Sequence, residues 1–172
     1  MADLWRGLAR RRVTLGYVLG AAAWWFADPT WAWLAIGAAV GGLGEALRIW
    51  AAGHLEKGRE VTTTGPYAIT RHPLYAGSTI MGAGLALAAH SVVVAVLVAA
   101  YLGITLLAAV RSEEAHLTEK FGATYPAYRE GRAEPAARRF SFERAWRNRE
   151  YRALLGLAAV LGLLAVRLWI RL

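Results

Sequence analysis

Residues 74–110 read LYAGSTIMGAGLALAAHSVVVAVLVAAYLGITLLAAV and contain no aspartate, glutamate, lysine or arginine. Only the pair His90-Ser91 divides this stretch, leaving apolar segments at 74–89 and 92–110. Because the hydrocarbon core of a bilayer is about 30 Å thick, a helix needs about 20 residues to cross it. The stretch therefore predicts a helical hairpin in a membrane, with very little chain outside the bilayer at its turn.

Three further apolar stretches, 13–27, 31–52 and 151–170, flank this hairpin. The first has the length of a signal-peptide core, but no small-residue cleavage site follows it, and a second span begins after the turn Asp28-Pro29-Thr30. We therefore expect a retained hairpin. The chain is predicted to be all-α: a polytopic integral membrane helical bundle of about five transmembrane helices, forming a single domain over residues 1–172.

The composition agrees with a membrane protein and narrows the chemistry. Hydrophobic residues make up 57% of the chain and the mean hydropathy is +0.34, which is too apolar for an ordinary soluble domain. The chain has no cysteine, which excludes disulfides, thiolate nucleophiles and thiolate metal ligands. No close His-x-x-x-His pair occurs among its histidines, so we expect no metal site.

The net charge of +8 is distributed asymmetrically. Of the 20 lysines and arginines, 18 fall within residues 6–12, 48–71 and 111–152, and the other two are Arg167 and Arg171. This positive-inside pattern accounts for the charge without a nucleic acid partner. It predicts a cytoplasmic N-terminus, with Arg167 and Arg171 reaching the opposite headgroups. The alanine-, arginine-, glycine- and leucine-rich composition suggests a bacterial inner membrane.

Small and charged residues share the apolar stretch 31–52. Little side-chain bulk is present at Gly37, Gly41, Gly42 and Gly44, which favours close packing against another helix. Glu45 and Arg48 are three residues apart and therefore share a face of that helix. A charge at mid-bilayer costs about 2.5–3.5 kcal/mol on insertion scales, so this pair should point inward or lie near the cytoplasmic end. A structural pair and a role in a site both remain open.

A cationic segment precedes the hairpin directly. Pro73 suits the first turn of a helix, which places Arg71 and His72 at the membrane–water boundary and Tyr75 one turn inside. Unpaired N–H groups at this helix start would add to a pocket that favours anions. The alternative is an interfacial anchor, in which the arginine binds lipid phosphate and the tyrosine lies among the headgroups.

The acidic pair Glu113-Glu114 follows the second helix of the hairpin. From Ser112 the sequence predicts a separate amphipathic helix that ends at Gly122. Adjacent helical residues diverge by about 100°, so only one glutamate should face a shared pocket, leaving the other to contact Arg111 or Lys120. Alternatively, both glutamates simply favour the positive end of that helix.

Together these motifs resemble those of the isoprenylcysteine carboxyl methyltransferase family, with its bacterial and archaeal members and the related phospholipid methyltransferases. The resemblance extends over about residues 45–130. It rests on Arg48-x-Trp50-Ala51-x-Gly53-His54-Leu55-x-Lys57, Gly65-Pro66-Tyr67, Arg71-His72-Pro73-x-Tyr75-x-Gly77 and Glu113-Glu114-x-x-Leu117-x-x-x-Phe121-Gly122-x-x-Tyr125-x-x-Tyr128. The chain departs from the family after the paired tyrosines, where Arg132-Ala133-Glu134-Pro135 replaces a Val-Pro-Arg-like stretch.

The resemblance implies S-adenosylmethionine as the methyl donor, bound at the cytoplasmic ends of the helices. Segments 54–73 and 111–149 would form this catalytic region. The implied catalytic residues are Arg71, His72 and Glu114. The implied cofactor-binding residues are Tyr67, Arg71, His72, Tyr75, Glu113 and Glu114.

The acceptor implied by the resemblance is a lipophilic small molecule or a lipid-linked group, with membrane lipids as surroundings. A carboxylate acceptor needs no general base, whereas an ammonium acceptor must first lose a proton, for which Glu114 or His72 would serve. Two alternatives stay open: an NADPH-dependent membrane reductase of the sterol-reductase type, and a non-enzymatic lipid-binding protein. The interpretation as a methyltransferase requires that the segment around residue 71 and the acidic pair Glu113-Glu114 lie together at one end of the bundle.

Overall fold

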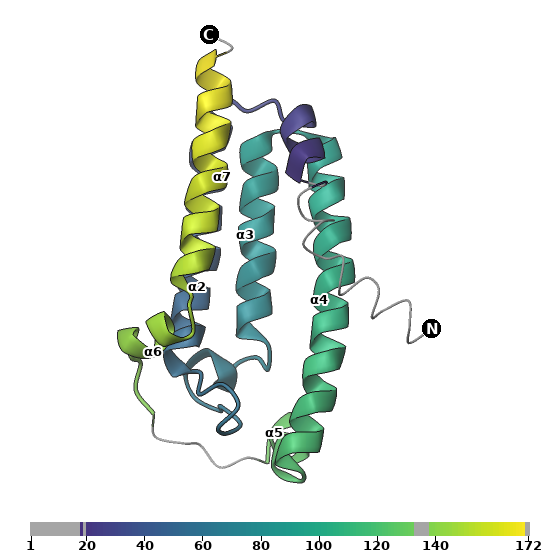
Figure 1. Ribbon diagram of the computed structural model, residues 1–172, viewed down its shortest axis with the longest axis vertical. Coiled ribbons are helices and arrows are strands. Elements are labelled where there is room, and N and C mark those ends of the chain that lie inside the picture. Colours follow the sequence, from purple (N-terminus) through teal and green to yellow (C-terminus); the bar gives the residue numbers. More distant parts are fainter. Residues whose placement is uncertain (1–17, 19, 133–137, 171–172) are drawn as a thin grey trace.

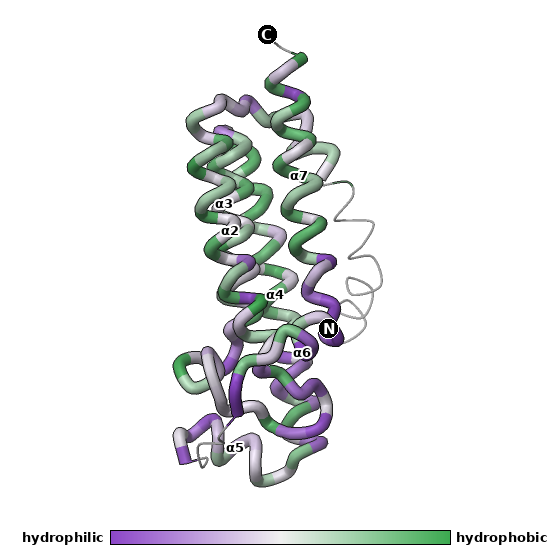
Figure 2. Tube along the Cα trace, turned by 90° about the vertical axis from the view of Figure 1, so that its left-hand side faces the viewer, coloured by the Kyte–Doolittle hydropathy of each residue, from purple (hydrophilic) through white to green (hydrophobic). Residues whose placement is uncertain are grey.

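The computed structural model describes residues 18, 20–132 and 138–170, and these residues contain no strand. Four long helices lie side by side (Figure 1): α2 (Trp31–His54), α3 (Pro73–Ala89), α4 (Val92–Phe121) and α7 (Tyr151–Ile170). The short elements are η1 (Gly65–Ala68), α5 (Thr124–Arg129) and α6 (Phe142–Arg147), and residues 20–26 are also helical. The long helices are mostly apolar, whereas the short elements and the polar loops gather at one end (Figure 2). The prediction of a helical membrane bundle is confirmed.

Three of the described helices, α2, α4 and α7, are long and apolar enough to cross a bilayer. The fourth, α3, is also apolar but has only 17 residues, about 25 Å of helix. These four helices occupy the apolar stretches predicted at 31–52, 74–89, 92–110 and 151–170. The remaining stretch, 13–27, falls partly on residues outside those described.

The helix α4 continues without a break for 30 residues, a length of about 45 Å. The prediction of a separate amphipathic helix from Ser112 is therefore wrong. The segment after Val110 contains no proline and is rich in helix-favouring glutamate, alanine, leucine and lysine, so nothing interrupts the hydrogen-bond ladder. The predicted end is confirmed, because Gly122 terminates the helix with φ +52°.

Glycines bring α2 and α3 into direct backbone contact. A Cβ atom added at Gly84 would lie 2.4 Å from the Gly41 nitrogen, and one added at Gly44 would lie 2.6 Å from the Met81 nitrogen. A Cβ atom at Gly37 would lie 2.4 Å from the Gly84 oxygen. The predicted role of glycines in helix packing is thus confirmed at three of the four positions on α2. Gly42 differs, because it is exposed and a Cβ atom there would meet nothing within 4 Å.

The carboxyl end of α2 is closed by side chains from the C-terminal part of the chain. Asn148 Nδ2 donates to the carbonyl oxygens of Ala52 and Leu55, both at 2.9 Å. Arg144 Nη1 donates to the Gly53 oxygen at 2.5 Å. The last carbonyls of a helix have no partner within it and carry partial negative charge, so a cation and an amide satisfy them well. These bonds fix α6 beside the polar end of the bundle.

At the opposite end, Arg167 contacts the first described helical residues. Its Nη2 atom donates to the Trp25 oxygen at 3.1 Å, and its guanidinium lies 5.3 Å from the centre of the Trp24 ring. The residue therefore ties α7 to the helical residues 20–26, and its contact with lipid headgroups stays a prediction. Arg171, predicted to act in the same way, lies outside the described residues.

Candidate functional site

The cationic segment before α3 meets α4 at the polar end of the bundle. His72 is the N-cap of α3 and Pro73 lies in its first turn, as predicted. The Glu114 Oε1 atom lies 3.0 Å from His72 Nε2 and 3.3 Å from Arg71 Nη1. One carboxylate oxygen thus contacts both a guanidinium and an imidazole, which belong to a segment about 40 residues away in sequence. The two motifs converge.

The second glutamate also contacts the start of α3. Tyr75 Oη donates to Glu113 Oε2 at 2.6 Å, so the prediction that one glutamate would contact Arg111 or Lys120 is wrong. Tyr75 follows His72 by three residues, which places both on one face of the helix, and their rings stack with centroids 5.7 Å apart. Glu113 and Glu114 point in different directions from α4. Each still has a partner at the start of α3, which is Tyr75 for Glu113 and His72 for Glu114.

A cluster of tyrosines adjoins the acidic pair. Tyr128 Oη donates to the backbone oxygen of Tyr67 at 2.6 Å, and the rings of Tyr125 and Tyr128 have centroids 6.2 Å apart. Burial, and after it the Glu113 carboxylate, raises the pKa of Tyr67. Burial and then the charge of Glu114 raise the pKa of Tyr125, and burial raises the pKa of Tyr128 to about 12. All three hydroxyls therefore remain protonated near neutral pH.

The tyrosine cluster also shows which residues the sequence analysis missed. Tyr67, a predicted cofactor-binding residue, is only 8% exposed, so its ring is largely inside the protein. Tyr125 and Tyr128 were not among the predicted site residues. Both belong to the motif that begins at Glu113, and their spacing of three residues placed them on one helix face. That pattern was the signal by which they could have been found.

A buried ionic cluster lies beside this site, between α2, α3 and the start of α7. Arg48 Nη2 is 2.5 Å from Glu150 Oε1, and Arg48 Nε is 3.8 Å from Glu45 Oε2. Arg48 Nη1 also donates to Ser78 Oγ at 2.5 Å and to the Leu74 oxygen at 3.3 Å. Glu45 and Arg48 therefore form the ion pair that their spacing of three residues allows, and a role of the pair in a site stays open. Glu150 was not predicted, because nothing in the sequence indicates a contact across about 100 residues.

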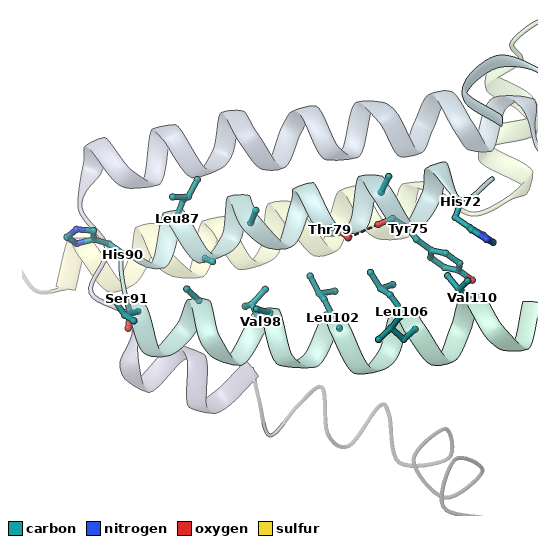
Figure 3. Close-up of a pocket in the computed structure, with 18 of the residues that line it drawn as sticks. His72, Tyr75, Thr79, Leu87, His90, Ser91, Val98, Leu102, Leu106 and Val110 are labelled. Atoms are coloured by element: carbon teal, nitrogen blue, oxygen red, sulfur yellow. Dashed lines mark hydrogen bonds between the residues drawn. The ribbon is translucent and has the colours of Figure 1, made fainter. Parts of the chain in front are cut away.

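An apolar groove of about 980 Å³ runs between α3 and α4 (Figure 3). One end is lined by His72 and Tyr75, and the other by Trp33, His90 and Ser91. Between these ends the walls are almost entirely apolar: Ala76, Ala83 and Ala86 on α3 face Val98, Leu102 and Leu106 on α4. The polar cluster around Glu114 therefore adjoins a groove that suits a lipophilic molecule.

Comparisons with known proteins agree with this arrangement. The profile of the phospholipid methyltransferase family matches residues 13–124. In an alignment 115 positions long that covers 63% of this chain, the sequence is 32% identical to the nickel-cobalt-cadmium resistance protein NccN of Alcaligenes xylosoxydans xylosoxydans. The match covers 52% of that protein, so the chain spans about half the length of this curated relative. No solved structure matches the chain.

Proposed function

This chain belongs to the phospholipid methyltransferase family, and we propose that it is a membrane methyltransferase whose methyl donor is S-adenosylmethionine and whose acceptor is a lipophilic molecule. The observation that supports this proposal best is the double contact of Glu114 Oε1 with Arg71 and His72, beside the open end of an apolar groove. Water-soluble donor and membrane-soluble acceptor would meet at this junction.

The residues around Glu114 match the chemistry of the donor. S-adenosylmethionine has a carboxylate, an ammonium, a ribose diol, an adenine and a sulfonium. Arg71 is 42% exposed in its side chain and offers a guanidinium to the carboxylate. Glu113 offers a carboxylate to the ammonium or to the ribose hydroxyls. The Tyr75 ring, stacked on His72, offers a face to the adenine or to the sulfonium.

When bound, the donor supplies an activated methyl group, whose bond to sulfur breaks as a bond to the acceptor oxygen or nitrogen forms. The protein must position the two reactants in line and exclude water. Arg71 and His72 would be held in place by Glu114, and Tyr75 by Glu113. If the acceptor is an amine, it must lose a proton before or during transfer, and the His72 imidazole or the Glu114 carboxylate would accept it. A carboxylate acceptor needs no such step.

The distribution of basic residues supports a proposed orientation in the membrane. The site lies at the polar end of the bundle, where the basic residues of segments 54–73 and 111–132 also lie. The positive-inside rule favours a cytoplasmic location for this end, which would put the site in reach of cytoplasmic S-adenosylmethionine. In a bacterial cell the protein would lie in the inner membrane.

Donor binding tests the proposal directly. Purified protein in lipid nanodiscs should bind S-adenosylmethionine saturably in a calorimetric titration. Because a hydrogen bond to a charged group contributes about 1.5–3 kcal/mol, Glu114→Gln should weaken binding by about 10- to 100-fold. Glu119→Gln, at an exposed position on the same helix, is the matched control and should leave the affinity unchanged.

Absence of saturable binding in the wild type would contradict the proposed donor, as would equal weakening by the control substitution. Binding of NADPH instead of S-adenosylmethionine would favour a membrane reductase. If the donor binds, incubation with a membrane lipid extract and methyl-labelled donor should give a labelled lipophilic product, whose mass identifies the acceptor.

A further inference from the structure

We propose that Glu150, at the junction of α6 and α7, is a positioning residue for the donor site. It holds Arg48 against the start of α3, the helix that carries Tyr75 and is capped by His72. This inference rests on the proposed function and deepens it. It also gives a role to the C-terminal part of the chain, because Glu150 lies beyond residues 13–124, which match the family profile.

The side chain of Arg48 covers the face of α3 that packs against α2. Its Nη1 atom donates to the Leu74 oxygen and to Ser78 Oγ, and Ser78 Oγ itself donates to the Leu74 oxygen at 2.9 Å. The stem of the arginine packs on the same helix, since a Cβ atom added at Gly77 would lie 2.5 Å from Arg48 Cγ. One side chain from α2 thus contacts the first two turns of α3.

The same two turns carry the candidate donor-binding residues on another face. His72 and Tyr75 point toward α4, where they contact Glu114 and Glu113 (Figure 3). Because successive helical residues turn by about 100°, the face that Arg48 contacts differs from the face that points to α4. The backbone of a helix is stiff over two turns, so a shift on the first face also moves His72 and Tyr75.

Two carboxylates compete for the guanidinium of Arg48. Its Nη2 atom lies 2.5 Å from Glu150 Oε1, whereas its Nε atom is 3.8 Å from Glu45 Oε2. Glu45 is only 2% exposed, and among the described residues neither of its carboxylate oxygens has a hydrogen-bond partner. A buried charge without a partner is costly, so Glu45 would attract the arginine if Glu150 released it. Glu150 therefore keeps Arg48 on the α3 side.

The segment that carries Glu150 is itself attached to α2, the helix that carries Arg48. Asn148 and Arg144 bind carbonyl oxygens at the end of α2. The Glu150 nitrogen donates to the Ala145 oxygen at 3.2 Å, which joins the residue to the end of α6. Glu150 thus lies at a fixed place between α6 and α7, and its contact with Arg48 relates the C-terminal helix to the start of α3.

Two isosteric substitutions, Glu150→Gln and Glu45→Gln, test this inference as a matched pair. Each leaves Arg48 with one buried carboxylate, so the two variants have the same formal charge. In calorimetric titrations in nanodiscs, Glu150→Gln should weaken binding of S-adenosylmethionine about tenfold, because Arg48 turns away from α3 toward Glu45. Glu45→Gln should bind the donor as the wild type does, because the contacts of Arg48 with Glu150 and α3 remain.

The double variant, with both substitutions, separates positioning from stability. When neither carboxylate is present, nothing draws Arg48 away from Ser78 and Leu74, so the donor affinity should be higher than in Glu150→Gln. The guanidinium then lies in a largely buried place without a carboxylate, so the melting temperature should be the lowest of the series. A residue with only a structural role would give the weakest binding in the least stable protein.

Hydrogen exchange, followed by mass spectrometry, gives a readout that needs no donor. Without S-adenosylmethionine, the amides of residues 75–80 should exchange about fivefold faster or more in Glu150→Gln, and at the wild-type rate in Glu45→Gln. The amides of residues 83–88, at the other end of α3, are the internal control and should be unchanged in both. Should Glu150→Gln fail to fold, Ser78→Ala removes an acceptor of Arg48 on α3 and should weaken donor binding.

Other results would overturn the inference. Equal affinities in Glu150→Gln and Glu45→Gln would show that the direction of Arg48 does not matter, as would an unchanged affinity in Ser78→Ala. A double variant that binds the donor more weakly than Glu150→Gln would leave Glu150 with a structural role only. If no protein binds S-adenosylmethionine but the difference in exchange is present, the proposed function fails, while the positioning of α3 by Glu150 stands.

Discussion

Glu56, just beyond the end of α2, connects three arginines from two parts of the chain. Its Oε1 atom lies 2.8 Å from Arg144 Nε and 3.3 Å from Arg147 Nη2, and its Oε2 atom lies 3.8 Å from Arg59 Nη1. The hydrogen bond from Arg144, followed by the charges of Arg147, Arg144 and Arg59, lowers the pKa of Glu56 below its ordinary value of 4.5. The ionised carboxylate therefore stabilises the junction of α2 and α6.

This lowered pKa predicts a loss of stability in acid. A carboxyl whose pKa is lower in the folded state contributes stability above its unfolded pKa, and loses it as the pH falls through the folded value. We expect the melting temperature of the wild type to fall as the pH is lowered from 5 to 3, and Glu56→Gln to lose part of that dependence. Thermal unfolding in nanodiscs across this range measures it. Glu119→Gln should retain the full dependence, and an identical slope in Glu56→Gln would contradict the assignment.

At the scale of single residues, the sequence predicted the contact between the two motifs but not the ionic contacts around it. Arg71, His72 and Glu114 form a contact that was predicted from two motifs, because both motifs border the same apolar hairpin and therefore emerge at the same end of it. The contact of Arg48 with Glu150 could not be predicted, because the position of α7 depends on packing against α2 and α3. No local pattern encodes that packing.

At the scale of helices, the contact of α2 with α3 gives a prediction with an internal control. A Cβ atom at Gly84 would lie 2.4 Å from a backbone nitrogen that cannot move aside, so Gly84→Ala should destabilise the protein by about 1–3 kcal/mol. At Gly42 the added methyl meets nothing within 4 Å, and alanine is favoured over glycine in a helix by about 0.5–1 kcal/mol. Gly42→Ala should therefore be neutral or stabilising.

Denaturant titration of both variants measures these free energies of unfolding. If Gly84→Ala and Gly42→Ala behaved alike, the backbone contact between α2 and α3 would not contribute as described. Affinity for S-adenosylmethionine should fall with Gly84→Ala, since α3 supplies His72 and Tyr75, and should be unaffected by Gly42→Ala.

The extent of each helix was predictable where hydropathy or a terminating residue defines it. Pro73 and Gly122 mark helix ends in the sequence and in the structure. The continuity of α4 across Val110 was missed, because hydropathy changes there while helix propensity does not. A change in polarity marks where a helix leaves the bilayer, and it does not mark where the helix ends.

For the whole molecule, the distribution of charge predicts one orientation in the membrane. The absence of native cysteine allows this to be tested with single introduced thiols. In intact bacterial cells, an impermeant maleimide should label Thr30→Cys, at the outer turn, and should not label Glu119→Cys, at the polar end, until the inner membrane is opened. Labelling in the reverse order would invert the orientation and place the site away from the cytoplasm.

The architecture of the whole bundle was predictable because membrane insertion limits the choices. Apolar segments of sufficient length must be helical in a bilayer, and short turns make neighbours antiparallel. The groove was not predicted as a shape, although the alanines that form one of its walls are visible in the sequence. Its existence depends on how far α4 stands from α3, which is set by side chains from two helices at once.

The two faces of α3 have unequal mechanical properties. On the α2 side, backbone meets backbone through glycines, an arrangement that tolerates almost no displacement. On the α4 side, the contact is made by side chains, with Leu102 and Val98 lying against Gly82, and the apolar groove runs beside this contact. We therefore expect the bundle to open by movement of α4 away from a rigid α2–α3 unit. Such a movement would have to break the contacts of Glu114 with Arg71 and His72.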